Sequence, residues 1–202
     1  MGLNKKIKIE DLKDNRAVSE AREKFRDDRT RGIVKWVFEI IVTLVFAVLV
    51  AISAFQTVTL QESAMEPTYS VGEKFFVNRA LYKFSSPKRG DVIVFKTSAS
   101  DSAALHIRRV IGLPGETVQV KDGQVYINGK VYEENGAYQD MTDGGLADSA
   151  VTLESGEYFV LGDNRNNSED SRFSDIGNIN KKYIVGKIWF TVSPKNKIGF
   201  IK

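Results

Sequence analysis

Four short stretches contain most of the polar residues that could act together in a site. They read SAMEPT (63–68), KRGDVIVFK (88–96), RRVIGLPGE (108–116) and GDNRNNSEDSR (162–172). A serine hydroxyl is a poor nucleophile until a nearby base takes its proton. Lysine can be that base only where burial lowers its pKa from about 10.4 towards about 7–8. Chemistry of this kind would therefore need a serine in one stretch to face a buried lysine in another.

Composition excludes several other kinds of site. The chain has no cysteine, which excludes disulfides, thiolate catalysis and cysteine-bound metal. Its single histidine, His106, excludes a metal site built from several histidines of one chain. A net charge of +3 over 202 residues is too small to indicate nucleic-acid binding. We therefore expect no metal site built from cysteines or from several histidines, and no nucleic-acid partner.

In this order, after an apolar N-terminal segment, the four stretches resemble the conserved boxes of type I signal peptidases. The resemblance covers about residues 35–202 and is highly specific because four boxes match together. It implies a mostly-β, LexA-like domain outside the membrane, with a serine nucleophile and a lysine general base. It also implies removal of signal peptides from exported preproteins at the outer membrane surface, without metal or cofactor.

The chain departs from this family at both catalytic positions. Ala64 occupies the nucleophile position, before Met-x-Pro-Thr, and Arg108 occupies the general-base position, before Arg-Val-Ile-Gly. Alanine has no nucleophilic atom, and arginine stays protonated near neutral pH. Glu62 is a third departure, since relatives commonly have glycine or serine there and a carboxylate would repel an oxyanion. We therefore expect the chain to be inactive as a peptidase.

Two neighbouring residues could in principle replace the missing groups. Ser63 adjoins Ala64, but on a strand successive side chains point to opposite faces. His106 lies two residues before Arg108, so both side chains can share one face. We expect neither to act, and we interpret His106 as an ordinary half-exposed strand histidine.

The other expected site residues line or support the centre. Glu62, Ser63, Met65 and Pro67 are expected to line it, with Met65 packed beneath. A hydrogen-bonded loop behind the site is expected from Asp163, Asn164, Arg165, Ser168, Asp170, Ser171 and Arg172. In relatives the residues matching Asp170 and Ser171 support the catalytic pair. We also predict that Glu62 and Arg108 form an ion pair in the inactive centre, because each buried charge is costly without the other.

An apolar segment precedes the four stretches. Residues 37–55 include one charge, Glu39, and approach the roughly 20 residues that cross a bilayer. Trp36 lies at the start of the segment, where interfacial aromatics are favoured. Basic residues precede it, namely Arg29, Arg31 and Lys35. Basic flanks stay in the cytoplasm, so we predict a single-pass cell-membrane protein with its N-terminus inside and its main domain extracellular. A cleaved signal peptide and a buried core helix are the alternatives.

We divide the chain into a charged cytosolic tail (1–33), a transmembrane anchor (34–55) and an extracytoplasmic domain (56–202). Runs rich in β-branched and aromatic residues predict strands at 73–79, 91–96, 105–112, 117–120, 124–129, 157–162 and 183–192. Asn128-Gly129 predicts a tight hairpin. The polar segment 134–152 is expected to be a surface insertion.

Three functional interpretations follow from the resemblance. The first is a non-catalytic homologue, similar to inactive signal-peptidase-like proteins that assist pilus assembly. Its partners would be exported proteins or pilin subunits, with a sortase as a further candidate. A peptide groove could survive loss of the catalytic pair, because strand addition and side-chain pockets hold extended peptides. The second is a working signal peptidase that carries inactivating Ser-to-Ala and Lys-to-Arg changes. The third, a LexA-like autoprotease, is disfavoured by the anchor and by the lack of a DNA-binding domain.

Overall fold

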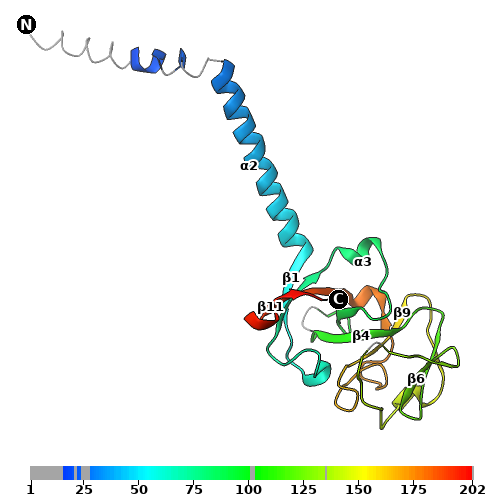
Figure 1. The fold of residues 1–202 in the computed structure, drawn as a ribbon. Helices are drawn as coiled ribbons and strands as arrows, with labels where there is room; N and C mark the ends of the chain where they lie inside the picture. Colours follow the sequence, from blue (N-terminus) through cyan, green and yellow to red (C-terminus); the bar gives the residue numbers. More distant parts are fainter. Residues whose placement is uncertain (1–15, 21, 24–27, 101–102, 135, 202) are drawn as a thin grey trace, which may run out of the picture. The chain divides into compact units, whose positions relative to one another are not determined.

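The computed structural model describes residues 16–20, 22–23, 28–100, 103–134 and 136–201 (Figure 1). The chain forms two compact units, Met1–Ile52 and Ser53–Lys202. Helical turns occur at residues 16–20 and 22–23, within the expected charged tail. The first 15 residues of that tail lie outside the described part of the chain.

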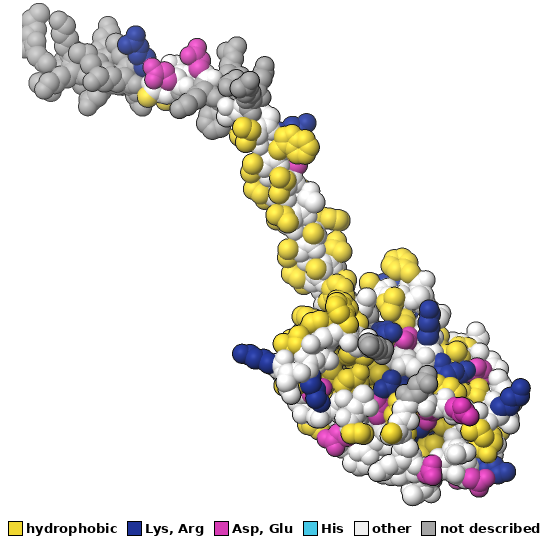
Figure 2. Space-filling model, viewed as in Figure 1, with side chains coloured by type: hydrophobic (Ala, Val, Ile, Leu, Met, Phe, Trp, Pro, Cys, Tyr) yellow, Lys and Arg dark blue, Asp and Glu magenta, His cyan; other side chains and the backbone are white. Residues whose placement is uncertain are grey.

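Helix α2 (Asp28–Ala54) contains the predicted apolar segment. The most apolar window within Thr30–Ile52 has a mean hydropathy of 2.5, and none of that window is buried by protein. Hydrophobic side chains cover the visible side of this helix (Figure 2). The helix is thus long and apolar enough to cross a membrane. It ends one residue earlier than we predicted, since Phe55 already belongs to a strand.

The second unit is built on an eight-stranded sheet in the order β1-β2-β11-β3-β4-β9-β10, with β12 also paired to β11. The strands are β1 (Phe55–Thr59), β2 (Lys74–Asn78), β3 (Val92–Phe95), β4 (His106–Gly112), β9 (Glu157–Leu161), β10 (Ile179–Asn180), β11 (Ile184–Ser193) and β12 (Gly199–Phe200). Neighbouring strands of this sheet pair antiparallel, and register shifts interrupt β4 and β11. Such bulges increase local twist, which suits a curled sheet.

A second, four-stranded sheet has the order β7-β6-β5-β8. Its strands are β5 (Thr117–Lys121), β6 (Gln124–Ile127), β7 (Lys130–Val131) and β8 (Val151–Thr152). Asn128 and Gly129 join β6 to β7 with φ values of 51° and 76°, the left-handed pair that a tight hairpin turn requires. The predicted hairpin is therefore confirmed.

Short helical turns connect the strands. They are η1 (Ser63–Met65), α3 (Leu81–Phe84), η2 (Gly145–Asp148), η3 (Lys181–Tyr183) and η4 (Lys195–Lys197). The turn η1 corrects one of our assumptions, because we placed residues 62–64 on a strand. Glu62 is extended, with φ −114° and ψ 149°, but the chain turns immediately after it.

Apolar side chains form three clusters within the second unit. One packs Met65 and Phe75 between β1, β2 and β3, and another packs Ile111 and Phe159 against the four-stranded sheet. The segment 134–152 does not lie wholly on the surface as expected, because Met141 and Ala147 join this second cluster. Two apolar residues of this segment therefore belong to the core, whereas most of its polar residues are exposed.

Candidate functional site

Ala64 and Arg108, which the resemblance assigns to the nucleophile and general-base positions, lie on different elements and line one pocket. Ala64 is buried in η1, and Arg108 lies in the middle of β4 with 1% of its side chain exposed. Strand β4 is fixed between β3 and β9, where Arg108 faces Ile93 across the ladder. Its backbone therefore holds residue 108 on a rigid element.

Every nitrogen of the Arg108 guanidinium donates a hydrogen bond. Nε donates to the carbonyl oxygen of Glu169 at 2.8 Å, and Nη1 donates to the carbonyl oxygen of Ile107 at 2.8 Å. Nη2 donates to Oε2 of Glu62 at 2.7 Å. This pairing of Glu62 with Arg108 is the ion pair that we predicted. A buried guanidinium fully engaged in this way is fixed in position.

Glu62 also contacts a second side chain, that of His106, which the sequence analysis did not assign. His106 Nδ1 lies 3.0 Å from Glu62 Oε1, close enough for an ion pair but without regular hydrogen-bond geometry. His106 also stacks on Phe95, with ring centroids 5.7 Å apart. Because His106 and Arg108 are two residues apart on β4, both side chains reach the same carboxylate.

The surroundings of Glu62 strongly favour its charged form. The contact with His106 lowers the pKa of the carboxyl most, partial burial opposes this, and Arg108 lowers it further. The resulting pKa is about 2, compared with an ordinary value of 4.5. Glu62 is therefore a permanent anion near neutral pH, and it neutralises Arg108.

Asparagines of the 162–172 loop hold the turn η1 in place. The amide of Asn164 donates to the carbonyl oxygen of Ala64 at 3.0 Å, and its side chain donates to the carbonyl oxygen of Ser63 at 3.2 Å. Asn167 Nδ2 donates to the Ser63 hydroxyl at 3.1 Å. The hydroxyl of Ser63, the residue next to Ala64 in the sequence, thus already has a hydrogen-bond partner.

Ser168 and Gly162 complete the wall beside Ala64. A side chain at Gly162 would meet Ser168 Oγ at 2.2 Å and the Ala64 carbonyl oxygen at 2.5 Å, so only glycine fits this close approach. Within the described part of the chain, Ser168 Oγ is buried and has no hydrogen-bond partner. The resemblance pointed to Ser171 as the supporting hydroxyl. The structure instead places Ser168 beside residue 64, whereas the Ser171 hydroxyl accepts from the Val160 amide at 2.9 Å.

A surface pocket of about 540 Å³ opens over this centre. Its lining consists of Glu62, Ser63, Ala64, Arg108, Asn166, Asn167, Ser168, Glu169, Phe173 and Asp175. Met65 packs in the core below, as expected, but exposed Pro67 is not among the lining residues. The lining is mainly polar. Its described residues include carboxylates and amides, and Phe173 is the one aromatic residue among them.

The loop of residues 162–172, behind the pocket, is held together by buried ion pairs and hydrogen bonds. Asp170 and Arg172 are buried and joined by a two-point ion pair of 2.8 and 3.0 Å. Asp170 also accepts from the Gly162 amide at 3.1 Å, and Arg172 donates to the Arg165 carbonyl oxygen at 2.6 Å. These bonds close the loop on itself, whereas its role in supporting the site stays a prediction.

Two further ion pairs attach this loop to its neighbours. Arg109 on β4 donates to both oxygens of Asp163, at 2.8 and 2.6 Å. Burial lowers the pKa of Arg109, but the hydrogen bonds and charge of Asp163 outweigh burial and raise it. Arg165 donates twice to Glu134 and lies 4.1 Å above the Tyr138 ring. The sequence analysis named Arg165 and Asp163 but missed Glu134, because the polar segment that contains it was interpreted as surface.

The described lining of the pocket has hydroxyls but no lysine that could act as their general base. Among its described lining residues the hydroxyls are those of Ser63 and Ser168, and the basic group is Arg108. A guanidinium cannot accept a proton near neutral pH. In the described part of the chain, no group of three or more His, Asp or Glu side chains could hold a metal ion. Its amides, its carboxylates and its open hollow are features through which the pocket could bind a ligand.

The fold and the pocket define a class of protein: a curled β-domain that follows one apolar helix and places a surface pocket between η1, β4 and the 162–172 loop. The family model described as "Signal peptidase, peptidase S26" matches residues 33–193. The chain belongs to this family.

Curated relatives agree with the family match. Signal peptidase I of Bacillus amyloliquefaciens is 36% identical over 186 residues, covering 87% of this chain and 96% of the relative. Signal peptidase I of Bacillus licheniformis is 33% identical over 178 residues, covering 85% and 94%. The crystal structure of a signal peptidase I from Enterococcus faecalis is 32% identical and covers 51% of this chain and 97% of that chain, with a TM-score of 0.42. The family model and the two sequence relatives carry the assignment.

Proposed function

We propose that this chain is a catalytically inactive member of the signal peptidase family that binds extended segments of exported proteins and assists their assembly at the cell surface. The proposed ligands are exported preproteins or pilin subunits, and the proposed further partner is a sortase. The family supplies the class of ligand, and the pocket supplies a place for it.

The observation that carries the proposal is the ion pair between Glu62 and Arg108. The two charges lie 2.7 Å apart beneath Ala64. A charged residue buried without a partner is costly, whereas this pair compensates both charges and His106 adds a third contact. A site altered only to remove activity would need substitutions at positions 64 and 108, but it would have no need of a carboxylate at position 62. The coordinated set therefore favours an adapted centre over a working peptidase that carries inactivating changes.

The pocket remains open although its chemistry is lost. Its 540 Å³ volume is in the range of ordinary ligand pockets. Peptides can be held along strands and in side-chain pockets without any reaction. We further propose that α2 anchors the protein in the cell membrane, with residues 1–33 in the cytoplasm and residues 56–202 outside. In that position the pocket would meet proteins as they leave the membrane.

The test is to separate binding from cleavage. The purified full chain is titrated with a fluorescent preprotein segment that ends in Ala-x-Ala, and cleavage is followed in the same samples. We expect binding without cleavage. Asn167→Trp, which fills the pocket, should weaken binding at least about tenfold, whereas Lys121→Trp on the exposed surface should not change it. Cleavage above background, or binding that is indifferent to Asn167→Trp, would reject the proposal.

A further inference from the structure

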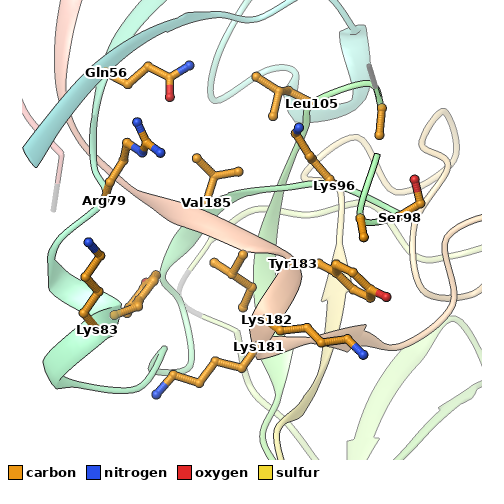
Figure 3. Close-up of a pocket in the computed structure, with 14 residues that line it drawn as sticks. Gln56, Arg79, Lys83, Lys96, Ser98, Leu105, Lys181, Lys182, Tyr183 and Val185 are labelled. Atoms are coloured by element: carbon orange, nitrogen blue, oxygen red, sulfur yellow. The ribbon is translucent and has the colours of Figure 1, made fainter. Parts of the chain in front are cut away.

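A second pocket, of about 970 Å³, is larger than the pocket of about 540 Å³ over Ala64, and its lining does not include Glu62, Ala64 or Arg108. Residues of β1, of the segment around α3, of the β3–β4 connection and of η3 surround it (Figure 3). Its lining includes five basic side chains, those of Arg79, Lys83, Lys96, Lys181 and Lys182. The described lining residues include no aspartate or glutamate. The pocket is therefore strongly cationic.

Most of these cations have no anionic partner within the described residues. Among the described residues, no ion pair involves Arg79 or Lys83, and both side chains are exposed. Lys181 Nζ donates to the neutral carbonyl oxygen of Ser85 at 2.7 Å, and Lys182 Nζ lies 4.9 Å above the Tyr183 ring. These contacts fix the position of the charges without neutralising them. A pocket with such a surplus attracts an anionic ligand.

The pocket begins close to the end of the apolar segment along the chain. Gln56 lines it, and the amide of Arg79 donates to the carbonyl oxygen of Ala54 at 2.9 Å. The apolar segment ends at Ile52. Four residues of extended chain reach at most roughly 14 Å, so the pocket wall starts within that distance of the segment. If α2 spans a membrane, as we propose, Gln56 at the edge of the pocket lies within roughly 14 Å of the end of the membrane-spanning segment.

Helix α3 adds an apolar side chain beside the basic ones. Phe84 is 91% exposed and Leu81 is 38% exposed, whereas Lys83 between them lines the pocket. A large aromatic residue left in water next to basic residues is typical of segments that rest at a membrane interface. The combination suits a ligand with an anionic head and an apolar tail.

We propose that this basic pocket binds the headgroup of an anionic phospholipid from the membrane that α2 enters. The phosphate would pair with Arg79, Lys83 and Lys182, and Phe84 would contact the acyl region. An acidic protein partner could satisfy the charges, but it would not account for Phe84 or for the short connection to the apolar segment. The proposal concerns a different site from the peptide pocket and does not depend on what that pocket binds.

The experiment uses the full chain in a neutral detergent. Native mass spectrometry measures the binding of dihexanoyl phosphatidylglycerol and of dihexanoyl phosphatidylcholine in separate titrations. The test variant is Arg79→Gln/Lys83→Gln/Lys182→Gln. The matched control, Lys74→Gln/Lys121→Gln/Lys130→Gln, removes the same charge from exposed positions that do not line the pocket. Circular dichroism confirms that both triple variants are folded.

We expect the parent chain to bind dihexanoyl phosphatidylglycerol at least about tenfold more tightly than dihexanoyl phosphatidylcholine. One basic residue near an anionic membrane surface contributes about fivefold in affinity, so the test variant should lose most of this preference and the control should keep it. Equal loss in both variants would reduce the effect to net charge and overturn the proposal. No preference in the parent chain, or full competition by equimolar inorganic phosphate or by a poly-glutamate peptide, would overturn it as well.

Discussion

At the scale of single residues, Glu62 determines whether a lysine at position 108 could act as a general base. It contacts Arg108 at 2.7 Å and His106 at 3.0 Å, so it would also contact a lysine placed at position 108. A neighbouring carboxylate stabilises the ammonium form and raises the pKa of such a lysine. A general base needs the opposite shift. Restoring the two family residues is thus not sufficient to restore catalysis.

We therefore expect Ala64→Ser alone to be inactive and Ala64→Ser/Arg108→Lys to stay slow. Adding Glu62→Ser should raise kcat/KM at least about a hundredfold over the double variant, because general-base catalysis contributes 10²–10⁴-fold. Cleavage of an Ala-x-Ala peptide measures this, and Glu66→Ser is the matched control for loss of a nearby carboxylate. A double variant as fast as the triple variant would show that Glu62 has no influence on residue 108.

The strength of the pair is the second prediction at this scale. Arg108 is 1% exposed but Glu62 is 37% exposed, so solvent screens part of the attraction. Glu62→Ala should lower the free energy of unfolding by about 1–2 kcal/mol, below the 3–5 kcal/mol of a fully buried pair. A double-mutant cycle with Arg108→Ala isolates the coupling. Glu66→Ala should cost under about 0.5 kcal/mol, and zero coupling between positions 62 and 108 would contradict the prediction.

The third prediction concerns pH. The pKa of Glu62 falls from 4.5 to about 2 on folding, chiefly through its contact with His106. A lowered pKa means that the stabilisation is present above about pH 4.5 and is lost as the pH falls towards 2. The difference in unfolding free energy between the parent chain and Glu62→Gln should therefore shrink steadily between pH 4.5 and 2. Chemical unfolding at several pH values measures it. A difference that is constant over this range would contradict the prediction.

At the scale of elements, the sequence predicted the strands with strong β-branched and aromatic patterns. Strands β2, β3, β4, β5, β6, β9 and β11 all lie within the predicted ranges or within one residue of them. The short strands β8, β10 and β12 could not be predicted, because two residues carry no pattern and their pairing depends on the tertiary fold. The turn η1 was missed for a related reason, since Ser-Ala-Met has no strong turn signal.

The candidate site was predictable where it depends on one strand. The alternation along β4 placed His106 and Arg108 on one face, and the pairing of Arg108 with Glu62 followed from charge compensation. The partners of the loop were not predictable. Asn164 and Asn167 bind Ser63 from more than 100 positions away, and only the fold brings them there.

The loop of residues 162–172 gives the fourth prediction. Asp170 is fully buried and holds both Arg172 and the Gly162 amide. Asp170→Asn removes the charge but keeps the shape, which leaves the buried guanidinium of Arg172 unpaired. We expect a loss of about 3–5 kcal/mol in unfolding free energy, measured by urea unfolding of the full chain in detergent. Asp175→Asn, in the same loop region but exposed, should cost under about 0.5 kcal/mol. Similar costs for both would show that the loop network is not structural.

At the scale of the whole molecule, two pockets of different character share one β-domain. The pocket over Ala64 is lined by amides and carboxylates, and the larger pocket beside α3 is lined by basic groups. Figure 2 shows the basic and acidic side chains distributed over the visible face of this domain, while apolar side chains follow α2. If the basic pocket binds lipid, the peptide pocket is held at a defined distance from the membrane, because both belong to the same compact unit.

The last prediction tests the membrane topology on which this arrangement depends. Basic residues precede the apolar segment and no comparable basic cluster immediately follows it, so residues 1–33 should be cytoplasmic and the β-domain outside. Because the chain has no cysteine, single introduced cysteines report position without background. Ser149→Cys, on the exposed surface, should react with an impermeant maleimide in intact cells, whereas Ser19→Cys should react only after the cells are opened. Labelling of Ser19→Cys in intact cells, or protection of Ser149→Cys, would reverse the orientation and place both pockets on the cytoplasmic side.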